Sequence, residues 1–297
     1  MKVCGKEIKV SGKLVRIARL DADKYLFVDD PESVINALRA SQQRIDLFTF
    51  IQRVNETLPK YPYPMEWDNF AVLPVSTFDH WWTKQVDAKT RNMVRKAEKK
   101  SVILREVSLE DSLAHGIWRI YNESSIRQGR RFPHYGKDQN TVYREAATYL
   151  ERSQFIGAFL DEELIGFIKL VWDEPGTQVG LMNIMSLIQH RDKAANNALL
   201  AAAVRFCGSR HISSLVYSNF AYGKKQGDSL SEFKRNNGFQ QVDVPRYYVP
   251  LTLWGQLAFR LGLHHRFVDR LPESIAAKLR AYREAWYKHR LNSAEAF

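Results

Sequence analysis

Cysteine is scarce in this sequence. The chain of 297 residues has two cysteines, Cys4 and Cys207, which stand far apart and outside any Cys/His ligand spacing. A disulfide framework needs more cysteines, and a structural zinc site needs Cys or His ligands at short spacings, so neither is indicated. We therefore expect a reducing compartment, the cytoplasm, and no metal.

Long apolar runs are also absent. No stretch of about 18 apolar residues occurs, and residues 1–10 carry four charges in place of the apolar core of a signal peptide. Neither a transmembrane segment nor export is expected. With 45% hydrophobic residues, 15 Gly and 10 Pro, the composition is typical of a folded protein rather than a disordered or repetitive one.

Acidic residues are outnumbered by basic ones. Lys and Arg total 44 against 33 Asp and Glu, a formal net charge of +11. This excess attracts anions such as phosphates, nucleic acid, cell-wall precursors or acidic lipid, and charge alone does not choose among them. The length allows one large core or two modest ones, and we expect two lobes and a tail.

The first third of the chain predicts short strands and a basic helix. Residues 13–28 alternate apolar and polar positions around an Asp-Ala-Asp turn, which predicts a hairpin. The stretch 45–54 fits either a buried strand or the start of a helix. A strand is expected at 71–75, followed by a helix whose final part is heavily basic.

The rest of the chain predicts a mixed α/β layer. A helix following Ser108, with Asp111 completing a variant capping arrangement, spans 108–129. Residues 154–172 form two apolar runs around the acidic turn Asp161-Glu162-Glu163, which predicts a hairpin. The other expected elements are a helix at 139–152, a strand at 180–188, an Ala-rich helix at 193–207 that ends at Gly208, a strand at 212–218, the segment SLSEFKRNNGF and the strand VDVPRYYVPL. This order indicates a mixed sheet rather than a doubly wound parallel one.

Over residues 65–250 these elements resemble the acyl-CoA N-acyltransferase fold of the GNAT superfamily. The hairpin FIGAFLDEELIGFIKLVW is similar to its second and third strands, and MNIMSLI with the helix at 193–207 is similar to its donor-binding strand and helix. The runs RNMVRKAEKKSV, ANNALLAAAVRFC and EFKRNNGF narrow the resemblance to the Fem-type branch, the aminoacyl-tRNA-dependent peptidoglycan bridge enzymes and their relatives. It implies a mixed α/β (α+β) fold: an N-terminal lobe at 1–107 that ends in a basic helix, a GNAT-like domain at 108–250 and a basic amphipathic helical tail at 251–297.

The resemblance places the donor site in residues 189–196, QHRDKAAN. In GNAT enzymes a glycine-containing loop here presents backbone amides at a helix N-terminus to the CoA pyrophosphate. This segment has no glycine, so side chains would hold phosphate instead, and Fem-type proteins depart from the CoA motif too. The implied donor is acyl-CoA or aminoacyl-tRNA, and the implied donor-binding residues are His190, Arg191, Lys193 and Asn196.

Two further cationic segments are candidates for binding an anion or the acceptor. In the basic helix, Arg91, Arg95 and Lys99 fall four apart on one face, which fits phosphate or RNA-backbone binding as well as a solvated surface helix. The loop at 127–135 follows a helix that borders the acceptor groove in the resembled fold. The candidate residues are Arg91, Arg95, Lys96, Arg127, Arg130, Arg131, His134 and Tyr135.

Acyl transfer to an amine needs a deprotonated nucleophile, a stabilised oxyanion and a proton for the leaving group. The candidate agents are Glu123, Tyr217, Tyr222 and Lys234, and we take Glu123, Tyr222 and Lys234 as the catalytic set. The resemblance puts Tyr222 where the fold has its acid or leaving-group contact, and Lys234 at the place of a functional lysine. An ordinary loop tyrosine and a solvated lysine are the alternatives.

The expected function is therefore transfer of an acyl or aminoacyl group from an activated carrier to an amine acceptor, with tRNA as a possible partner. The alternative is a non-catalytic protein of the same fold that binds nucleic acid or another anionic polymer through a basic groove. Residues 251–291 predict one or two basic amphipathic helices that pack against the body or a partner, or dock on a membrane surface.

Overall fold

The structure is a computed structural model. It describes residues 1–21, 26–127, 130–221, 229–265, 275, 278–279, 281–283 and 285–286. Two compact units make up the chain. Unit 1 comprises Met1–Val72, Val216–Lys234 and Phe239–Arg270, and unit 2 comprises Leu73–Leu215, Arg235–Gly238 and Leu271–Phe297. These units are discontinuous in sequence, and the three-segment division at 107/108 and 250/251 stays a prediction.

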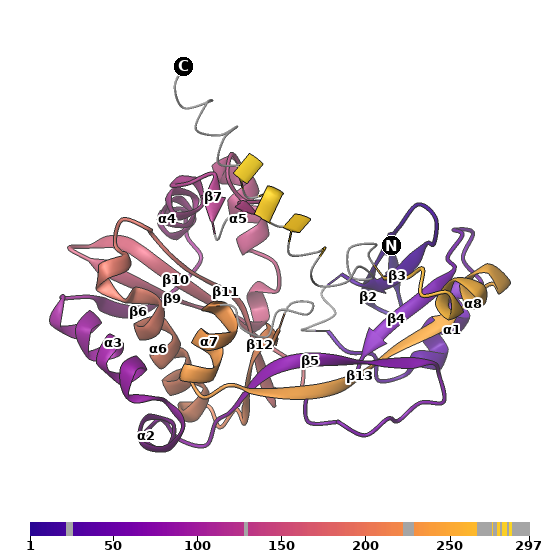
Figure 1. Cartoon of the computed structure of the whole chain (residues 1–297), viewed down its shortest axis with the longest axis horizontal. Coiled ribbons are helices and arrows are strands. Elements are labelled where there is room, and N and C mark those ends of the chain that lie inside the picture. Colours follow the sequence, from indigo (N-terminus) through magenta and orange to yellow (C-terminus); the bar gives the residue numbers. More distant parts are fainter. Residues whose placement is uncertain are drawn as a thin grey trace. The chain divides into compact units, whose positions relative to one another are not determined.

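Unit 1 is centred on a mixed sheet with the strand order β1-β2-β3-β4-β13-β5-β12. Its strands are β1 (Lys2–Val3), β2 (Lys6–Ser11), β3 (Ile17–Leu20), β4 (Leu47–Ile51), β5 (Met65–Pro74), β12 (Ser214–Asn219) and β13 (Gln240–Pro250). Its helices are α1 (Pro31–Arg39), α7 (Ser229–Asn236) and α8 (Leu253–Arg260). Strands β5 and β13 pair antiparallel over a long stretch, from Gln240 opposite Val72 to Tyr247 opposite Met65 (Figure 1).

Local sequence explains helix α1 and the core beneath it. Pro31 occupies the first turn, where its missing N–H costs nothing, and the Asp30 side chain accepts a hydrogen bond from the Ser33 amide. The apolar face of the helix, including Ile35 and Leu38, is buried in one cluster with Phe48 and Phe50 of β4. Strand β4 has all five residues buried, so the segment 45–54 is a strand and not a helix.

Unit 2 has an antiparallel sheet in the order β11-β10-β9-β6. Its strands are β6 (Ile103–Val107), β7 (Ile126–Arg127), β8 (Arg130–Arg131), β9 (Ser153–Leu160), β10 (Glu163–Trp172) and β11 (Gln178–Ser186), with β7 and β8 paired separately. Its helices are α2 (Phe78–His80), the π-helix η1 (Trp81–Gln85), α3 (Ala88–Lys99), α4 (Asp111–Asn122), α5 (Gln139–Ala146), the 3-10 turns η2 (Leu150–Arg152) and η3 (Arg191–Lys193), and α6 (Ala195–Ser209).

Helices cover both faces of this sheet. Helices α4 and α5 lie over one face, whereas α3 and α6 lie side by side over the other (Figure 1). Strand β10 is therefore buried on both sides, which explains why its sequence is an almost continuous apolar run.

The hairpin at 154–172 is confirmed. Its strands are β9 and β10, and Asp161 and Glu162 between them have positive φ values of 48° and 65°. Positive φ at both central residues is typical of a type I′ turn, whose backbone twist matches that of the flanking strands. Acidic residues tolerate this conformation better than β-branched ones do.

The hairpin predicted at 13–28 is wrong. Only residues 17–20 form a strand, β3, and both of its edges are occupied, by β2 antiparallel and by β4 parallel. Residues 22–25 lie outside the described residues. The apolar residues Phe27 and Val28 are buried without forming a strand, because β3 has no edge left for them.

Three helix ends also differ from expectation. Helix α4 runs from Asp111 to Asn122, and Glu110, not Ser108, holds the capping position, with no side-chain hydrogen bond to the helix. Helix α5 ends at Ala146, well before residue 152. Helix α6 includes Gly208 and ends at Ser209, so this glycine does not terminate it.

No helix in the described part of the chain is both long and apolar enough to span a bilayer.

Candidate functional site

A cleft of about 470 Å³ lies at the carboxyl end of β11 in unit 2. One side is formed by the short hairpin β7–β8 with Phe132, and the other by the end of β11 and the loop that leads into α6. Among the described residues that line it are four arginines and no carboxylate. We call it the arginine cleft; its polar residues are Arg127, Arg130, Arg131, Ser186, Arg191 and Asn196.

The structure thus brings together residues that the sequence assigned to separate sites. Arg130 and Arg131 are exposed members of the predicted acceptor loop, and Arg191 is an exposed member of the predicted donor loop. Their convergence makes a positive surface over an apolar wall that includes Phe132. Planar guanidinium groups in such a position suit bidentate contacts to phosphate.

Arg127 forms the fixed part of this cleft. Its guanidinium donates to the carbonyl oxygens of Ser186 (3.0 Å) and Ile120 (2.7 Å) and to the Glu123 carboxylate (3.0 Å). The group also lies 5.2 Å from the centre of the Phe132 ring. Burial lowers the pKa of Arg127 from its ordinary value. Its Nε atom is buried and has no hydrogen-bond partner among the described residues.

Glu123 holds the loop that follows β11. Its carboxylate accepts hydrogen bonds from the amides of Ile188 (2.6 Å) and Gln189 (2.9 Å) as well as from Arg127. Both oxygens are engaged, so a proton taken up by this group would displace a donor. The arrangement suits a residue that positions the loop better than it suits a general base.

Backbone amides of the predicted donor loop donate hydrogen bonds to carbonyls of the same loop. The Arg191 amide donates to the Ile188 carbonyl (3.0 Å), and the Lys193 amide donates to His190 (3.0 Å). Ala194 then adopts a left-handed conformation with φ 55° just before α6. Amides engaged in this way are not offered to a pyrophosphate, which accords with the lack of glycine.

The donor-loop side chains divide into two groups. Arg191 and Asn196 line the arginine cleft, and the Asn196 Oδ1 atom is buried without a partner among the described residues. Lys193 instead forms an ion pair with Asp192 at 3.3 Å. His190 precedes the 3-10 turn η3, and neither it nor Lys193 lines the cleft.

A second cavity, of about 270 Å³, lies under α4 and α5 in unit 2. His134 reaches it, with its ring 4.4 Å from that of Tyr121, and burial lowers the pKa of this histidine. Lys169 of β10 also lines it, is almost fully buried, and donates to the carbonyls of Ala146 (2.7 Å) and Thr148. Burial lowers the pKa of Lys169 to about 8.

Sequence reasoning missed Lys169. A single lysine inside the apolar run IGFIKLVW was the available signal, because a buried cation needs partners or a function. The ammonium group donates to the carbonyl of Ala146, the last residue of α5, a position where the helix dipole also favours a cation. A lysine with this pKa in a cavity is a functional-site candidate.

Lys234 is fully buried in unit 1 rather than solvated. It donates to the carbonyl of Asn219, at the end of β12, and lies 4.8 Å from the centre of the Tyr217 ring. The neighbouring Ser218 has a φ of 49°, an uncommon conformation for a residue other than glycine. Tyr222 lies outside the described residues.

The remaining predicted residues lie elsewhere. Arg91 donates to the carbonyls of Trp82 (3.2 Å) and Val86 (2.6 Å), so it joins helix α3 to the segment before it. Arg95 is exposed, with its guanidinium 5.6 Å from the centre of the Trp82 ring. Lys96 is half-buried on the same helix, and Tyr135 is exposed and lines neither cavity.

The fold of this chain is similar to those of FemX and of two structures named for lysylphosphatidylglycerol synthesis, which agrees with the predicted Fem-type resemblance and with the mixed α/β class. The structure of FemX is similar, with a TM-score of 0.57 at 11% identity over 86% of this chain and 86% of that one. L-PGS from Bacillus licheniformis is similar with a TM-score of 0.55 at 14% identity, over 88% of this chain and 87% of that one.

A third similar structure is the C-terminal domain assigned to a lysylphosphatidylglycerol synthetase from Agrobacterium fabrum. Its TM-score is 0.56 at 12% identity, over 88% of this chain and 85% of that one. At these identities the likeness is one of fold. No protein-family model matches the sequence, and no curated protein matches it.

Proposed function

We propose that this chain is an aminoacyltransferase that moves an aminoacyl group from tRNA to an amine acceptor in the cytoplasm. The observation that supports this most directly is the arginine cleft at the carboxyl end of β11, on a fold like that of FemX and L-PGS. Three exposed arginines, Arg130, Arg131 and Arg191, with no carboxylate among the described lining residues, suit a carrier that brings phosphates with its reactive ester.

The choice of aminoacyl-tRNA over acyl-CoA rests on the backbone of the donor loop. Pyrophosphate binding in the GNAT manner needs amides that point at the ligand. Here the amides of Ile188 and Gln189 are bound by Glu123, and that of Arg191 by a loop carbonyl. A donor held by side chains fits this loop better than one held by amides.

In the proposed reaction the protein takes little direct part in making and breaking covalent bonds. The neutral amine of the acceptor attacks the ester carbonyl, a C–N bond forms, the ester C–O bond breaks, and a proton passes from the amine to the leaving ribose oxygen. Positioning and electrostatic stabilisation supply most of the rate enhancement in such a reaction. We assign carrier binding to Arg130, Arg131 and Arg191, and loop positioning to Glu123.

Lys234 and Tyr222 complete the proposal. Because Lys234 is buried and bound to the Asn219 carbonyl, we assign it to holding the end of β12 in its conformation. Tyr222 remains our proposed leaving-group contact. His134 with Lys169 is proposed to bound the pocket for the acceptor or the aminoacyl side chain, since both line the 270 Å³ cavity.

The test is thermal stabilisation by candidate carriers. The purified chain is compared with acetyl-CoA, longer acyl-CoAs, aminoacyl-tRNA and uncharged tRNA, at low and at physiological salt. A carrier that binds only the folded state raises the melting temperature in a saturable way. The proposal predicts stabilisation by aminoacyl-tRNA that survives physiological salt; stabilisation by an acyl-CoA alone would replace tRNA as the donor.

Variants of the cleft arginines make this test specific. Removing one arginine that binds a phosphate reduces the slope of log affinity against log salt by about 0.7 to 0.9. We expect Arg130→Gln, Arg131→Gln and Arg191→Gln each to weaken tRNA binding with such a change. Arg39→Gln, at an exposed position in unit 1, is the charge-matched control and should bind as the parent does.

The alternative function is a non-catalytic protein that binds an anionic polymer. The engaged carboxylate of Glu123 is the observation in its favour, because it removes one candidate base from the catalytic set. A binder of this kind would hold charged and uncharged tRNA equally well and would lose both steeply with salt.

The segment after β13 supports a further contact with a partner or a membrane surface. Leu253, Leu257 and Leu261 recur at helical spacing and are 86%, 47% and 58% exposed. Trp254 faces the body instead, where it packs with Leu47 and Ala258. Co-sedimentation with anionic vesicles is compared for the wild-type chain and Leu257→Gln. A lipid contact predicts binding that the substitution weakens, whereas a protein contact predicts no binding to vesicles.

A further inference from the structure

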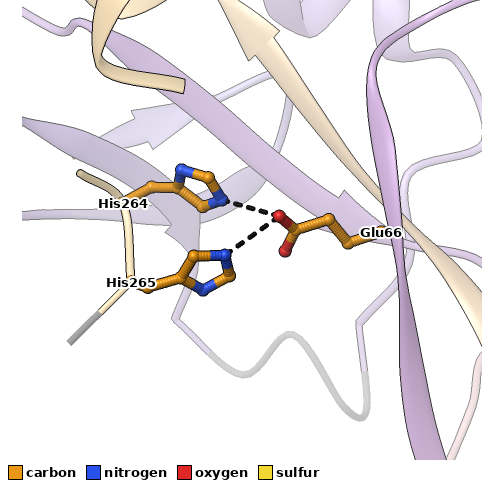
Figure 2. A group of neighbouring side chains, drawn as sticks. All are labelled: Glu66, His264 and His265. Atoms are coloured by element: carbon orange, nitrogen blue, oxygen red, sulfur yellow. Dashed lines mark hydrogen bonds and ion pairs between the residues drawn. The ribbon is translucent and has the colours of Figure 1, made fainter. Parts of the chain in front are cut away.

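Three side chains from distant parts of the sequence meet beside strand β5 in unit 1 (Figure 2). Glu66 is the second residue of β5, whereas His264 and His265 follow helix α8. The Nε2 atoms of both histidines point at the same carboxylate oxygen, at 2.9 Å from His264 and 3.0 Å from His265. The pair His264 and Glu66 is 198 residues apart, so sequence spacing gives no sign of the cluster.

The spacing of these atoms is close to that of a metal coordination shell. Ligand atoms bound at about 2.0–2.2 Å to a tetrahedral zinc ion lie about 3.3 Å from one another. The two nitrogen-to-oxygen distances here are shorter by only a few tenths of an ångström, and all three ligand atoms lie within 4.8 Å of one another. A small outward rotation of the side chains makes room for an ion.

The donor chemistry fits a zinc-class ion. Neutral imidazole nitrogen and carboxylate oxygen are preferred ligands of such ions, and two histidines with one carboxylate form a recurrent set. The two imidazole rings lie 4.0 Å apart, so both Nε2 atoms are near enough for one ion to bind them together.

The surroundings hold the first ligand in place. The His264 side chain is 2% exposed, and its ring packs against those of Tyr248 (4.6 Å) and Phe259 (4.8 Å). Such packing restricts the direction in which the ring points. Asp68, two residues along β5 from Glu66, is held by Arg246 at 2.6 Å and does not join the set.

We propose that Glu66, His264 and His265 bind one divalent transition-metal ion of the zinc class. The His265 and Glu66 side chains are 42% and 35% exposed, which leaves a fourth position open to water or to a ligand from solution. The ion would fasten the chain after α8 to strand β5. This inference stands on unit 1 alone and does not depend on the proposed transferase activity, so either can fail without the other.

Metal titration of the full chain tests the proposal. Chelator-treated protein is titrated with Zn²⁺ by calorimetry, and with Co²⁺, whose visible absorption reports tetrahedral coordination. The wild-type chain should bind one equivalent and gain melting temperature with Zn²⁺. Glu66→Gln and His265→Ala should each lower the affinity by at least about tenfold, since even the loss of residues that only support a ligand costs about 10–100-fold.

His265 is chosen because its side chain is exposed, so the variant keeps its fold; circular dichroism verifies this. His211→Ala removes an exposed histidine of unit 2 and should bind zinc as the wild type does. The proposal is overturned if the wild-type chain takes up no stoichiometric zinc, if Glu66→Gln and His265→Ala bind it as tightly as wild type, or if His211→Ala removes the binding.

Discussion

At the scale of single residues, three charged side chains of unit 2 hold backbone in place. Glu123 accepts hydrogen bonds from two loop amides and an arginine. Lys169 donates to the carbonyls of Ala146, at the end of α5, and of Thr148, just beyond it, and Arg91 donates to two carbonyls before α3. Hydrogen bonds to charged groups are among the stronger ones in proteins, so these residues stabilise the loops that they contact. Sequence alone showed their charge but not their partners.

Glu123→Gln tests the positioning role. A glutamine side chain presents an N–H where the carboxylate accepted one, so one of the amides of Ile188 and Gln189 loses its acceptor. We expect a loss of about 1–3 kcal/mol in the free energy of unfolding, measured by chemical denaturation. Glu110→Gln, exposed and without a side-chain hydrogen bond to α4, should change it by less than about 0.5 kcal/mol. Equal stability of the two variants would remove the positioning role.

Lys169 makes a pH-dependent contribution to stability. Its pKa falls from 10.5 to about 8 in the folded chain because burial disfavours the charged form. Between these two values the unfolded state holds more protons than the folded state, so the free energy of unfolding rises with pH through this window. Below about pH 8 the lysine is charged in both states and the burial cost is present in full.

The measurement is the pH dependence of the unfolding free energy for the wild type and for Lys169→Met. The wild type should rise more steeply between pH 8 and 10.5, by up to about 1.4 kcal/mol per pH unit. Lys99→Met, at an exposed end of α3, should keep the wild-type slope. Identical slopes for all three chains would show that Lys169 titrates as an ordinary lysine.

At the scale of helices and strands, patterns that involve neighbouring residues were predictable. The hairpin β9–β10 could be predicted from two apolar runs around Asp161 and Glu162, because both strands and their turn are contiguous in sequence. The run at 13–28 looked similar, yet β3 pairs with β2 and β4 instead. Local alternation identifies a strand but not which edge it meets.

The glycine positions also show that a local pattern does not reveal tertiary neighbours. Gly208 looked like the end of α6, but the helix passes through it, and a methyl group there would meet its nearest neighbour, the Phe78 amide nitrogen, at 3.5 Å. Gly255, which the sequence did not single out, lies in α8 where a methyl group would come within 1.9 Å of the Asp46 carbonyl oxygen. Close approach of two backbones, not the helix itself, dictates glycine at 255.

Opposite effects follow for alanine at the two sites. Gly208→Ala should stabilise the chain by about 0.5–1 kcal/mol, because alanine has the higher helix propensity and its methyl group would meet its nearest neighbour at an ordinary contact distance of 3.5 Å. Gly255→Ala should destabilise it by about 1–3 kcal/mol or more, because α8 must move away from Asp46. Thermal and chemical denaturation of both variants checks this pair; a Gly255→Ala chain as stable as the parent would contradict the close packing of α8.

At the scale of the whole molecule, the sequence indicated the fold but not the sites. The order of helices and strands from 65 to 250 was enough to point to a GNAT-like, Fem-type architecture. Sites depend on residues that the fold brings together, such as Arg131 with Arg191, or Glu66 with His264. No local spacing encodes such pairs. A single sequence therefore identifies candidate site residues but does not show which of them lie together.

The central claim is that the arginine cleft serves a transferase with an aminoacyl-tRNA donor. The most direct test is equilibrium competition between aminoacyl-tRNA and the same tRNA uncharged, at physiological salt. A transferase must recognise the aminoacyl ester as well as the phosphates, so we predict tighter binding of the charged form, and a similar weakening of both forms in Arg191→Gln. Equal affinity for the two forms, with both affinities falling together as salt rises, would contradict the claim and leave a binder of anionic polymers.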